Sequence, residues 1–420
     1  MLTRRKIANR LSTLGVLPGN LVEDVWECDI FSTMADHINA HNTFRAENGF
    51  DLEPKFSNLS SQHRPLSEVL AHDVNYLRRS GQLPEKLVSN IHFFEMYAAT
   101  QNSFFLKVPI VKSEAYAIIF SAAMICFVHS LFSKFNLLFS TTKTSECLPQ
   151  HDNILQSSDY SDEALLAGIY NDLEVFYRRE LIRKPITPFH YGDPYNYCEQ
   201  AEGARRFILA HEIGHLAFLL EPDLIPIKKS EFCEVLNKTL SDPATWHDKS
   251  EGFEKIGGEA AKCAANWTEE LGCDAFAMRT ILQNYPESAI QGSVQFELEN
   301  CLVGIMMLLV TFDLVETALG LKWSITHPPA HMRLTFIKTT IRESAIYKSN
   351  LPLRRVLDTN WKFLVLLKRM LASPNFNKSG GFADSLTFFN RLNEFGKGIM
   401  MTLTNASFGD PETKLHDHQF

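Results

Sequence analysis

The residues best suited to chemistry lie in one short segment, RRFILAHEIGHLAFLLEPD, which covers residues 205 to 223. From Phe207 to Leu220, every residue except His211, Glu212 and His215 is apolar or glycine. A helix formed by this segment would therefore be buried on nearly all sides. Because a buried carboxylate without partners is strongly destabilising or becomes neutral, these three ionisable side chains require compensation.

The spacing of His211 and His215 favours a metal ion as the compensating partner. Residues four apart on a helix lie one turn apart on the same face, where two imidazoles can bind one zinc ion. In this HExxH arrangement, Glu212 takes a proton from the attacking water and later delivers it to the leaving amine. The alternative is that the five residues occur together by chance. The burial of the segment favours a bound zinc ion (Zn2+) instead, because the metal would compensate the ionisable side chains.

A catalytic zinc site needs a third protein ligand, and the sequence offers two places for it. Ten residues beyond His211, where a longer HExxHxxGxxH signature would carry a third histidine, stands Glu221. Phe218 occupies the position of the glycine in that signature, which disfavours this class. Glu221 nevertheless stays a formal alternative.

The second place is the segment NWTEELGCDAFAMRTIL, in which Glu270 and Asp274 are four apart on one predicted helix face. Glu270 can bind the metal directly, and Asp274 can accept the Nδ1–H of a zinc-bound imidazole, with His211 the preferred partner. Glu269 is the neighbouring candidate for the ligand. The alternative is a solvated acidic turn, but the apolar residues on both sides favour the ligand interpretation.

A third motif, THPPAHMRL at residues 326 to 334, completes a family resemblance. HEIGH, ELGCD in the ExxxD pattern and HPPxxxR occur in the order typical of gluzincin zinc peptidases. The chain resembles the family of the CAAX prenyl proteases and the bacterial heat-shock membrane proteases over roughly residues 100 to 345. A looser resemblance is to bacterial phage-exclusion peptidases, which are intracellular enzymes that cleave a host protein.

The resemblance implies a zinc-dependent endopeptidase with a zincin-like core, acting on a protein or peptide substrate. His211, His215 and Glu270 would hold zinc, Glu212 would be the base and Asp274 would support a ligand. His327 would stabilise the oxyanion, or its THPP segment would serve merely as a helix cap and turn. We expect Arg333 to fix this segment through a carboxylate and His331 to be exposed.

Composition limits the partners and the compartment. The formal net charge of -8 gives no basic footprint for nucleic acid. The start of the chain lacks the continuous apolar core of a signal peptide, and the eight cysteines are scattered without a CxxC pair. We therefore expect a cytoplasmic protein with reduced thiols. The sequence gives no information on the oligomeric state.

Two apolar stretches, residues 115–132 and 302–315, are candidate membrane spans. The first contains Ser121, His129 and Ser130, while the second is short and contains Asp313, so both favour buried elements. An integral membrane metalloprotease is the first alternative function. A zinc-binding regulatory or scaffold protein without turnover is the second.

The expected fold class is α+β, mainly α, with a small sheet. FFLKVPIV and AYAIIFS are predicted strands, either of which could offer a sheet edge to an extended substrate, and the second runs into a helix. We expect an accessory, mostly helical region over 1–95, the metallopeptidase domain over 96–345 and a C-terminal helical region over 346–420. Apolar periodicity predicts further helices at 162–181, 203–220, 259–283, 295–319, 328–345, 350–372 and 383–396.

Overall fold

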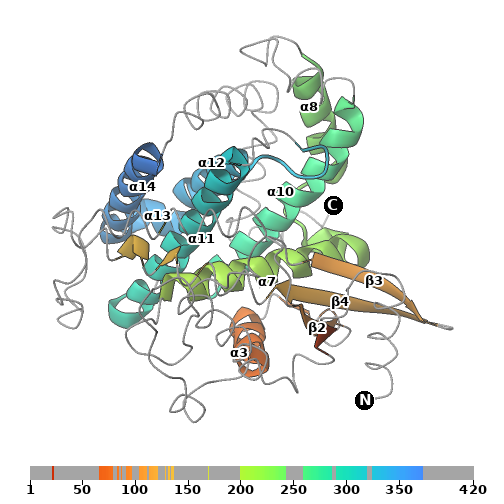
Figure 1. The fold of residues 1–420 in the computed structure, drawn as a ribbon, viewed down its shortest axis with the longest axis horizontal. Helices are drawn as coiled ribbons and strands as arrows, with labels where there is room; N and C mark the ends of the chain where they lie inside the picture. Colours follow the sequence, from red (N-terminus) through yellow and green to blue (C-terminus); the bar gives the residue numbers. More distant parts are fainter. Residues whose placement is uncertain are drawn as a thin grey trace, which may run out of the picture. The chain divides into compact units, whose positions relative to one another are not determined.

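In the residues that it describes, the computed structural model is mainly helical with one small sheet (Figure 1). Two compact units divide it, residues 1–212 and 213–420, and their boundary falls inside one helix after Glu212. The structure describes residues 21–22, 66–78, 83–84, 87, 91–96, 104–110, 113–121, 128, 131–132, 134–136, 169, 199–242, 259–285, 290–318 and 324–371.

The sheet belongs to the first unit and has the strand order β1-β2-β4-β3. β1 is Leu21–Val22, β2 is Ile91–Met96, β3 is Phe104–Ile110 and β4 is Ser113–Ser121. β2 runs parallel to β4, whereas β3 pairs with β4 in antiparallel register from Phe104 opposite Ile119 to Ile110 opposite Ser113. Both predicted strands are confirmed, and β2 is a strand that the sequence analysis missed.

The strand order decides which predicted strand can offer an edge. β4, which contains AYAIIFS, pairs with a neighbour on each side, so its backbone groups are already used. Within the described part of the sheet, β3 is an edge strand. AYAIIFS is therefore wrong as an edge candidate. Because β4 is a paired strand, the apolar stretch 115–132 is also not one continuous helix.

The helices agree closely with the apolar periodicity. α7 spans Glu199–Leu220, α10 spans Ala260–Leu282 and α11 spans Gly292–Ala318. The remaining described elements are α3 (Leu66–Arg78), η4 (Pro222–Leu224), α8 (Lys229–Ser241), α12 (Ala330–Glu343), α13 (Ala345–Ser349) and α14 (Leu351–Leu371). The predicted helix 383–396 lies outside the described residues, as does nearly all of 162–181. The predicted division at residues 95 and 345 stays a prediction.

In the first unit, charged side chains join α3 to the first half of α7. Asp73 is fully buried and accepts hydrogen bonds from the guanidinium groups of Arg205 and Arg206. Burial would raise the pKa of Asp73, but Arg205 in particular holds it below its usual range. The Arg206 guanidinium also lies over the ring of Tyr76, 3.9 Å from its centroid. This cluster fixes the part of α7 that leads into HEIGH.

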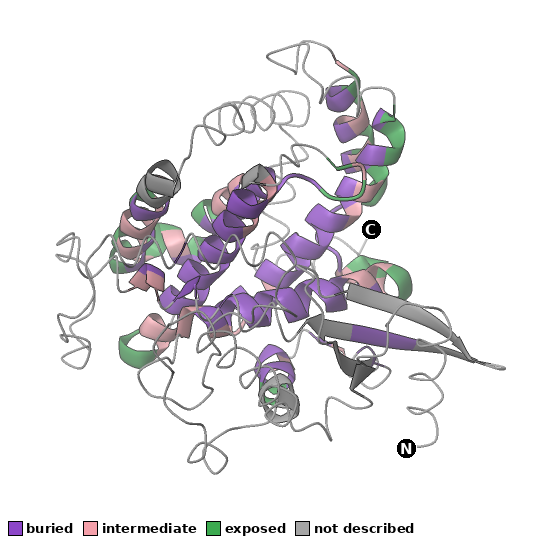
Figure 2. Ribbon diagram, in the orientation of Figure 1, coloured by how far each residue is buried: buried purple, intermediate pink, exposed green. Residues whose placement is uncertain are grey.

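In the second unit, α10 packs against α8 and α12, and α11 packs against α12 and α14. α10 and the core turns of α11 are buried along most of their length (Figure 2). Among the described residues, α11 is the one helix long and apolar enough to cross a membrane, yet most of that stretch is buried within the structure. Length and apolarity also suit the core helix of a soluble protein.

Two glycines allow α7 and α10 to approach closely. A methyl group added at Gly214 would lie 3.0 Å from the Cα of Cys273, whereas one added at Gly272 would lie 2.3 Å from the ring tip of Phe218. At Gly214 the obstacle is backbone, and at Gly272 it is the end of a half-buried side chain. The contact at Gly214 therefore limits how near the two helices can come.

The expected effect of Gly214→Val is a loss of about 2 to 3 kcal/mol in the free energy of unfolding, because the new side chain must displace the α10 backbone. Gly272→Ala is the control. Its clash can be relieved by rotation of Phe218, and alanine favours a helix by about 1 kcal/mol relative to glycine. Urea unfolding measures both. Unchanged stability of Gly214→Val would show that the helices have room to spare.

Candidate metal centre

Helix α7 presents the HEIGH residues as the sequence predicts. His211 and His215 lie one turn apart, and His211 and Glu212 are each only 6% exposed. The run of apolar residues around them makes α7 a core helix, so nearby solvent cannot balance these side chains. The compensation must come from other side chains or from a bound ion.

Helix α10 supplies the third member of the group, Glu270. One ligand atom from each of His211, His215 and Glu270 lies within 4.8 Å of the other two. Glu270 is 7% exposed, and its Oε1 lies 3.6 Å from Nε2 of His215. These three side chains could hold a metal ion, and they are called the metal group below. Glu221, at the start of η4, is not part of this group.

The separation of two of these donors fits a small divalent ion. Zinc–nitrogen and zinc–oxygen bonds of about 2.0 to 2.1 Å in a tetrahedron place two ligand atoms roughly 3.3 to 3.5 Å apart. The observed 3.6 Å between His215 Nε2 and Glu270 Oε1 is close to that separation. Two imidazoles and one carboxylate also leave a fourth position open, as in catalytic sites.

Glu269 supports the second histidine from the far side of its ring. Nδ1 of His215 lies 3.1 Å from Oε1 of Glu269, while Nζ of Lys229 on α8 lies 3.7 Å from Oε2. The hydrogen bond with His215 lowers the pKa of Glu269 despite partial burial. An ionised Glu269 holds the Nδ1–H tautomer of His215, so that Nε2 offers its lone pair toward the metal group.

Glu269 is also a candidate for the ligand position from the sequence, but the structure gives it a different contact. The signal was present, because Glu269 and Glu270 are adjacent acids on a largely apolar helix. Adjacent positions on a helix point about 100° apart, so two neighbours can meet different parts of one imidazole. Glu270 meets the Nε2 side of His215, and Glu269 meets the Nδ1 side.

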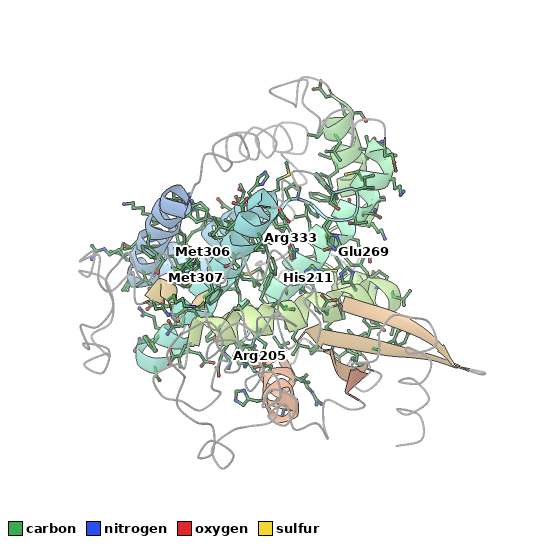
Figure 3. The ribbon with its side chains drawn as sticks, in the orientation of Figure 1. Arg205, His211, Glu269, Met306, Met307 and Arg333 are labelled. Carbon is green, nitrogen blue, oxygen red and sulfur yellow. The ribbon has the colours of Figure 1, made fainter. Side chains whose placement is uncertain are left out.

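Asp274 makes a bidentate pair with Arg333 of α12. Nε of Arg333 donates to one carboxylate oxygen at 2.9 Å, and Nη2 donates to the other at 2.7 Å. Burial alone would lower the pKa of Arg333 (labelled in Figure 3), but the charge and hydrogen bonds of Asp274 raise it above its ordinary value. The expectation that Arg333 fixes its segment through a carboxylate is confirmed. Support of His211 by Asp274 stays a prediction.

The loop that precedes α12 places His327 beside the metal group. Nε2 of His327 lies 3.4 Å from Oε1 of Glu270, and the side chain is 47% exposed. α10 holds the loop backbone, because Nε1 of Trp267 donates to the carbonyl of Ser324 at 2.9 Å. The ring of His327 therefore has one side toward Glu270 and another toward solvent.

His331, four residues further on, is buried, and the expectation that it is exposed is wrong. Only 9% of it is accessible, and its Nδ1 lies 3.7 Å from Oδ1 of Asp313 on α11. The sequence around it is polar enough to suggest a surface, but α12 packs this face against α11. The contact with His331 gives Asp313 a polar partner on the otherwise apolar helix α11.

Comparison with known proteins finds no relative of this chain. No protein-family model matches the chain, and neither the curated proteins nor the solved structures include a significant match.

Metal binding should depend on Glu270 and be indifferent to Glu221. We expect Glu270→Ala to lose most of its bound metal, because a negative ligand is removed, while Glu221→Ala keeps about one ion per chain. Elemental analysis of both purified variants measures the content and also identifies the metal, with circular dichroism as the folding control. Full metal retention by Glu270→Ala would remove that residue from the site.

The pair of Asp274 and Arg333 should matter for folding. Asp274→Ala leaves a largely buried guanidinium without its carboxylate, and we expect the free energy of unfolding to fall by about 3 kcal/mol. The matched control is Glu343→Ala, which breaks the exposed pair with Lys348 and should cost about 1 kcal/mol or less. Equal effects in urea unfolding would mean that Arg333 is well solvated without Asp274.

Proposed function

We propose that this chain is a zinc-dependent endopeptidase that hydrolyses peptide bonds of a protein substrate. The observation that supports it most is the meeting of His211, His215 and Glu270 beside a buried glutamate, Glu212. The resemblance of the three motifs to the gluzincin peptidases points to the same activity, and a zincin-like core is part of the proposal.

The donor set by itself suits more than one metal. Two histidines and one carboxylate also bind iron(II) in oxygenases, where open positions receive oxygen and a substrate. Zinc is favoured here because Glu212, a buried acid, follows His211 directly in the chain. A hydrolase needs such a base, and oxygen chemistry does not. The metal analysis described above distinguishes the two ions.

The chain's own side chains would divide the work of hydrolysis. Bound zinc would polarise the substrate carbonyl and make the attacking water more acidic. Glu212 would accept a proton as the water oxygen adds to the carbonyl carbon, and would return that proton to the amide nitrogen as the C–N bond breaks. His327, placed 3.4 Å from Glu270, would donate a hydrogen bond to the carbonyl oxygen as negative charge develops there.

The proposed location is the cytoplasm. Most of the apolar stretch of α11 is buried inside the structure, and the other apolar stretch, residues 115–132, begins in the paired strand β4. The four described cysteines, Cys233, Cys263, Cys273 and Cys301, are free thiols, which suits a reducing compartment. These features support the soluble enzyme over an integral membrane metalloprotease.

Substitution of the proposed base separates an enzyme from a metal-binding scaffold. We expect Glu212→Gln to keep its zinc while turnover falls by about 100-fold or more, because the proton transfer is lost and no metal ligand is removed. The substrate need not be known beforehand, since mass spectrometry can compare proteins cleaved in cells that express wild type or Glu212→Gln. Identical cleavage patterns in the two would contradict the proposal.

A further inference from the structure

The first turn of helix α12 cannot cap itself. Its N-cap residue is Pro329, which makes no side-chain hydrogen bond. The carbonyl of Pro329 accepts from the N–H groups of Met332 at 2.9 Å and Arg333 at 3.1 Å. Ala330 is buried, and its N–H lies too early in the helix to have an acceptor within it. Because a buried N–H without an acceptor is destabilising, the acceptor must come from another element.

Helix α11 supplies this acceptor through Glu316. Its Oε2 accepts a hydrogen bond from the N–H of Ala330 at 2.8 Å. Asp313, three residues earlier on α11, lies 3.7 Å from Nδ1 of His331. Two acids on one helix thus contact the first two residues of α12, in agreement with the packing of α11 against α12 (Figure 1).

The negative charge of Glu316 suits this position. The N–H groups of a first turn and the aligned peptide dipoles make the N-terminus of a helix positive. Burial alone would lower the pKa of Arg333, but the charges of Asp274 and, to a smaller extent, Glu316 raise it. Glu316 therefore interacts favourably with both the helix terminus and a guanidinium. Its hydrogen bond has a charged acceptor, which makes it stronger than one between neutral groups.

The segment between His327 and Ala330 is stiff. It consists of Pro328 and Pro329, whose rings fix φ, and a residue that precedes proline is restricted to extended backbone. Pro329 has φ −53° and ψ 143°, which is such a conformation. A stiff segment transmits a displacement of its end to its other end. The position of the Ala330 N–H therefore affects the position of His327.

The other end of the loop is attached to α10. Nδ2 of Asn266 donates to the carbonyl of Ile325 at 3.1 Å, and Nε1 of Trp267 donates to the carbonyl of Ser324 at 2.9 Å. His327 thus lies between an attachment to α10 and an attachment to α11. Of the hydrogen bonds and ion pairs that join α12 to other helices in the described residues, the one with Glu316 lies nearest to His327 along the chain.

We propose that Glu316 is a positioning residue for His327. By capping α12 through the N–H of Ala330, its carboxylate holds the proline segment where the His327 ring lies beside Glu270. A donor to the reacting carbonyl must be placed closely, because a displacement of about 1 Å can lower the rate about 100-fold. The inference rests on the proposed function, since it concerns the residue that would stabilise the oxyanion.

Two substitutions of Glu316 separate the hydrogen bond from the charge. Glu316→Ala removes the acceptor, whereas Glu316→Gln keeps a side-chain oxygen of the same reach without the charge. Ile341→Ala is the control for a general loss of stability, because it removes a buried side chain about three turns further along α12. All three are made in the full-length protein.

Hydrogen exchange shows how firmly the loop is held, without any substrate. Mass spectrometry of overlapping fragments separates the amides of Thr326 and His327 from that of Ala330. We expect their exchange to be faster on the order of 10-fold in Glu316→Ala, and close to wild type in Glu316→Gln and Ile341→Ala. Metal content should stay at the wild-type value in all three, because no ligand is changed. Unchanged exchange of the loop in Glu316→Ala would overturn the inference.

Turnover of a peptide that contains a cleavage site of the wild type connects this attachment to catalysis. We expect kcat of Glu316→Ala to fall by about 10- to 100-fold with little change in KM. Glu316→Gln should lie within about fivefold of wild type, because a charge at a helix terminus has a small effect. Ile341→Ala should turn over normally at a temperature where it is folded.

A double substitution tests whether Glu316 acts through His327. In a His327→Phe background, Glu316→Ala should change kcat by less than about twofold, because the residue that it positions is gone. Equal effects in the two backgrounds, or a normal kcat of Glu316→Ala, would overturn the inference. If the wild type cleaves no protein although loop exchange responds as expected, the proposed function fails and the attachment of the loop by Glu316 stands.

Discussion

The metal group depends on the close approach of α7 and α10 at Gly214 and Cys273. A larger residue would crowd the α10 backbone at this point, since an added methyl group would lie 3.0 Å from the Cα of Cys273. His215 follows that glycine directly, and Glu270 lies one turn before Asp274 on the facing helix. The contact between the helices thus brings an imidazole and a carboxylate together, and any increase in the separation would move the two ligands apart.

Helix α10 supplies Glu270 to the metal group and also holds the side chains and the loop around that group. Asn266 and Trp267 hold the loop before α12. Glu269 and Glu270 contact the two sides of the His215 ring. Asp274 pairs with Arg333. Side chains on one rigid helix keep fixed mutual distances, so these contacts hold the group in one arrangement. The same helix also fixes the position of the loop that carries His327.

Charge balance explains why so many ionisable groups can share this interior. Asp274 is neutralised by Arg333, Asp313 lies beside His331, and Glu269 contacts both His215 and Lys229. Glu270 has two imidazoles nearby, and a divalent ion would compensate it further. These partners matter because α7 and α11 are apolar, and a charge without a partner in apolar surroundings strongly destabilises the fold.

The sequence by itself determined the local features: the helix that carries HEIGH, the i, i+4 spacing of its histidines, the helix that carries Glu270 and the two strands 104–110 and 113–121. These follow from periodicity, which is set by neighbouring residues. Only the tertiary structure decided that Arg333 meets Asp274 across 59 residues, that Glu269 supports His215, that His331 is buried against Asp313 and that β3 is an edge strand. Such pairings depend on how distant elements pack. The local pattern of one segment does not indicate which distant segment it will contact.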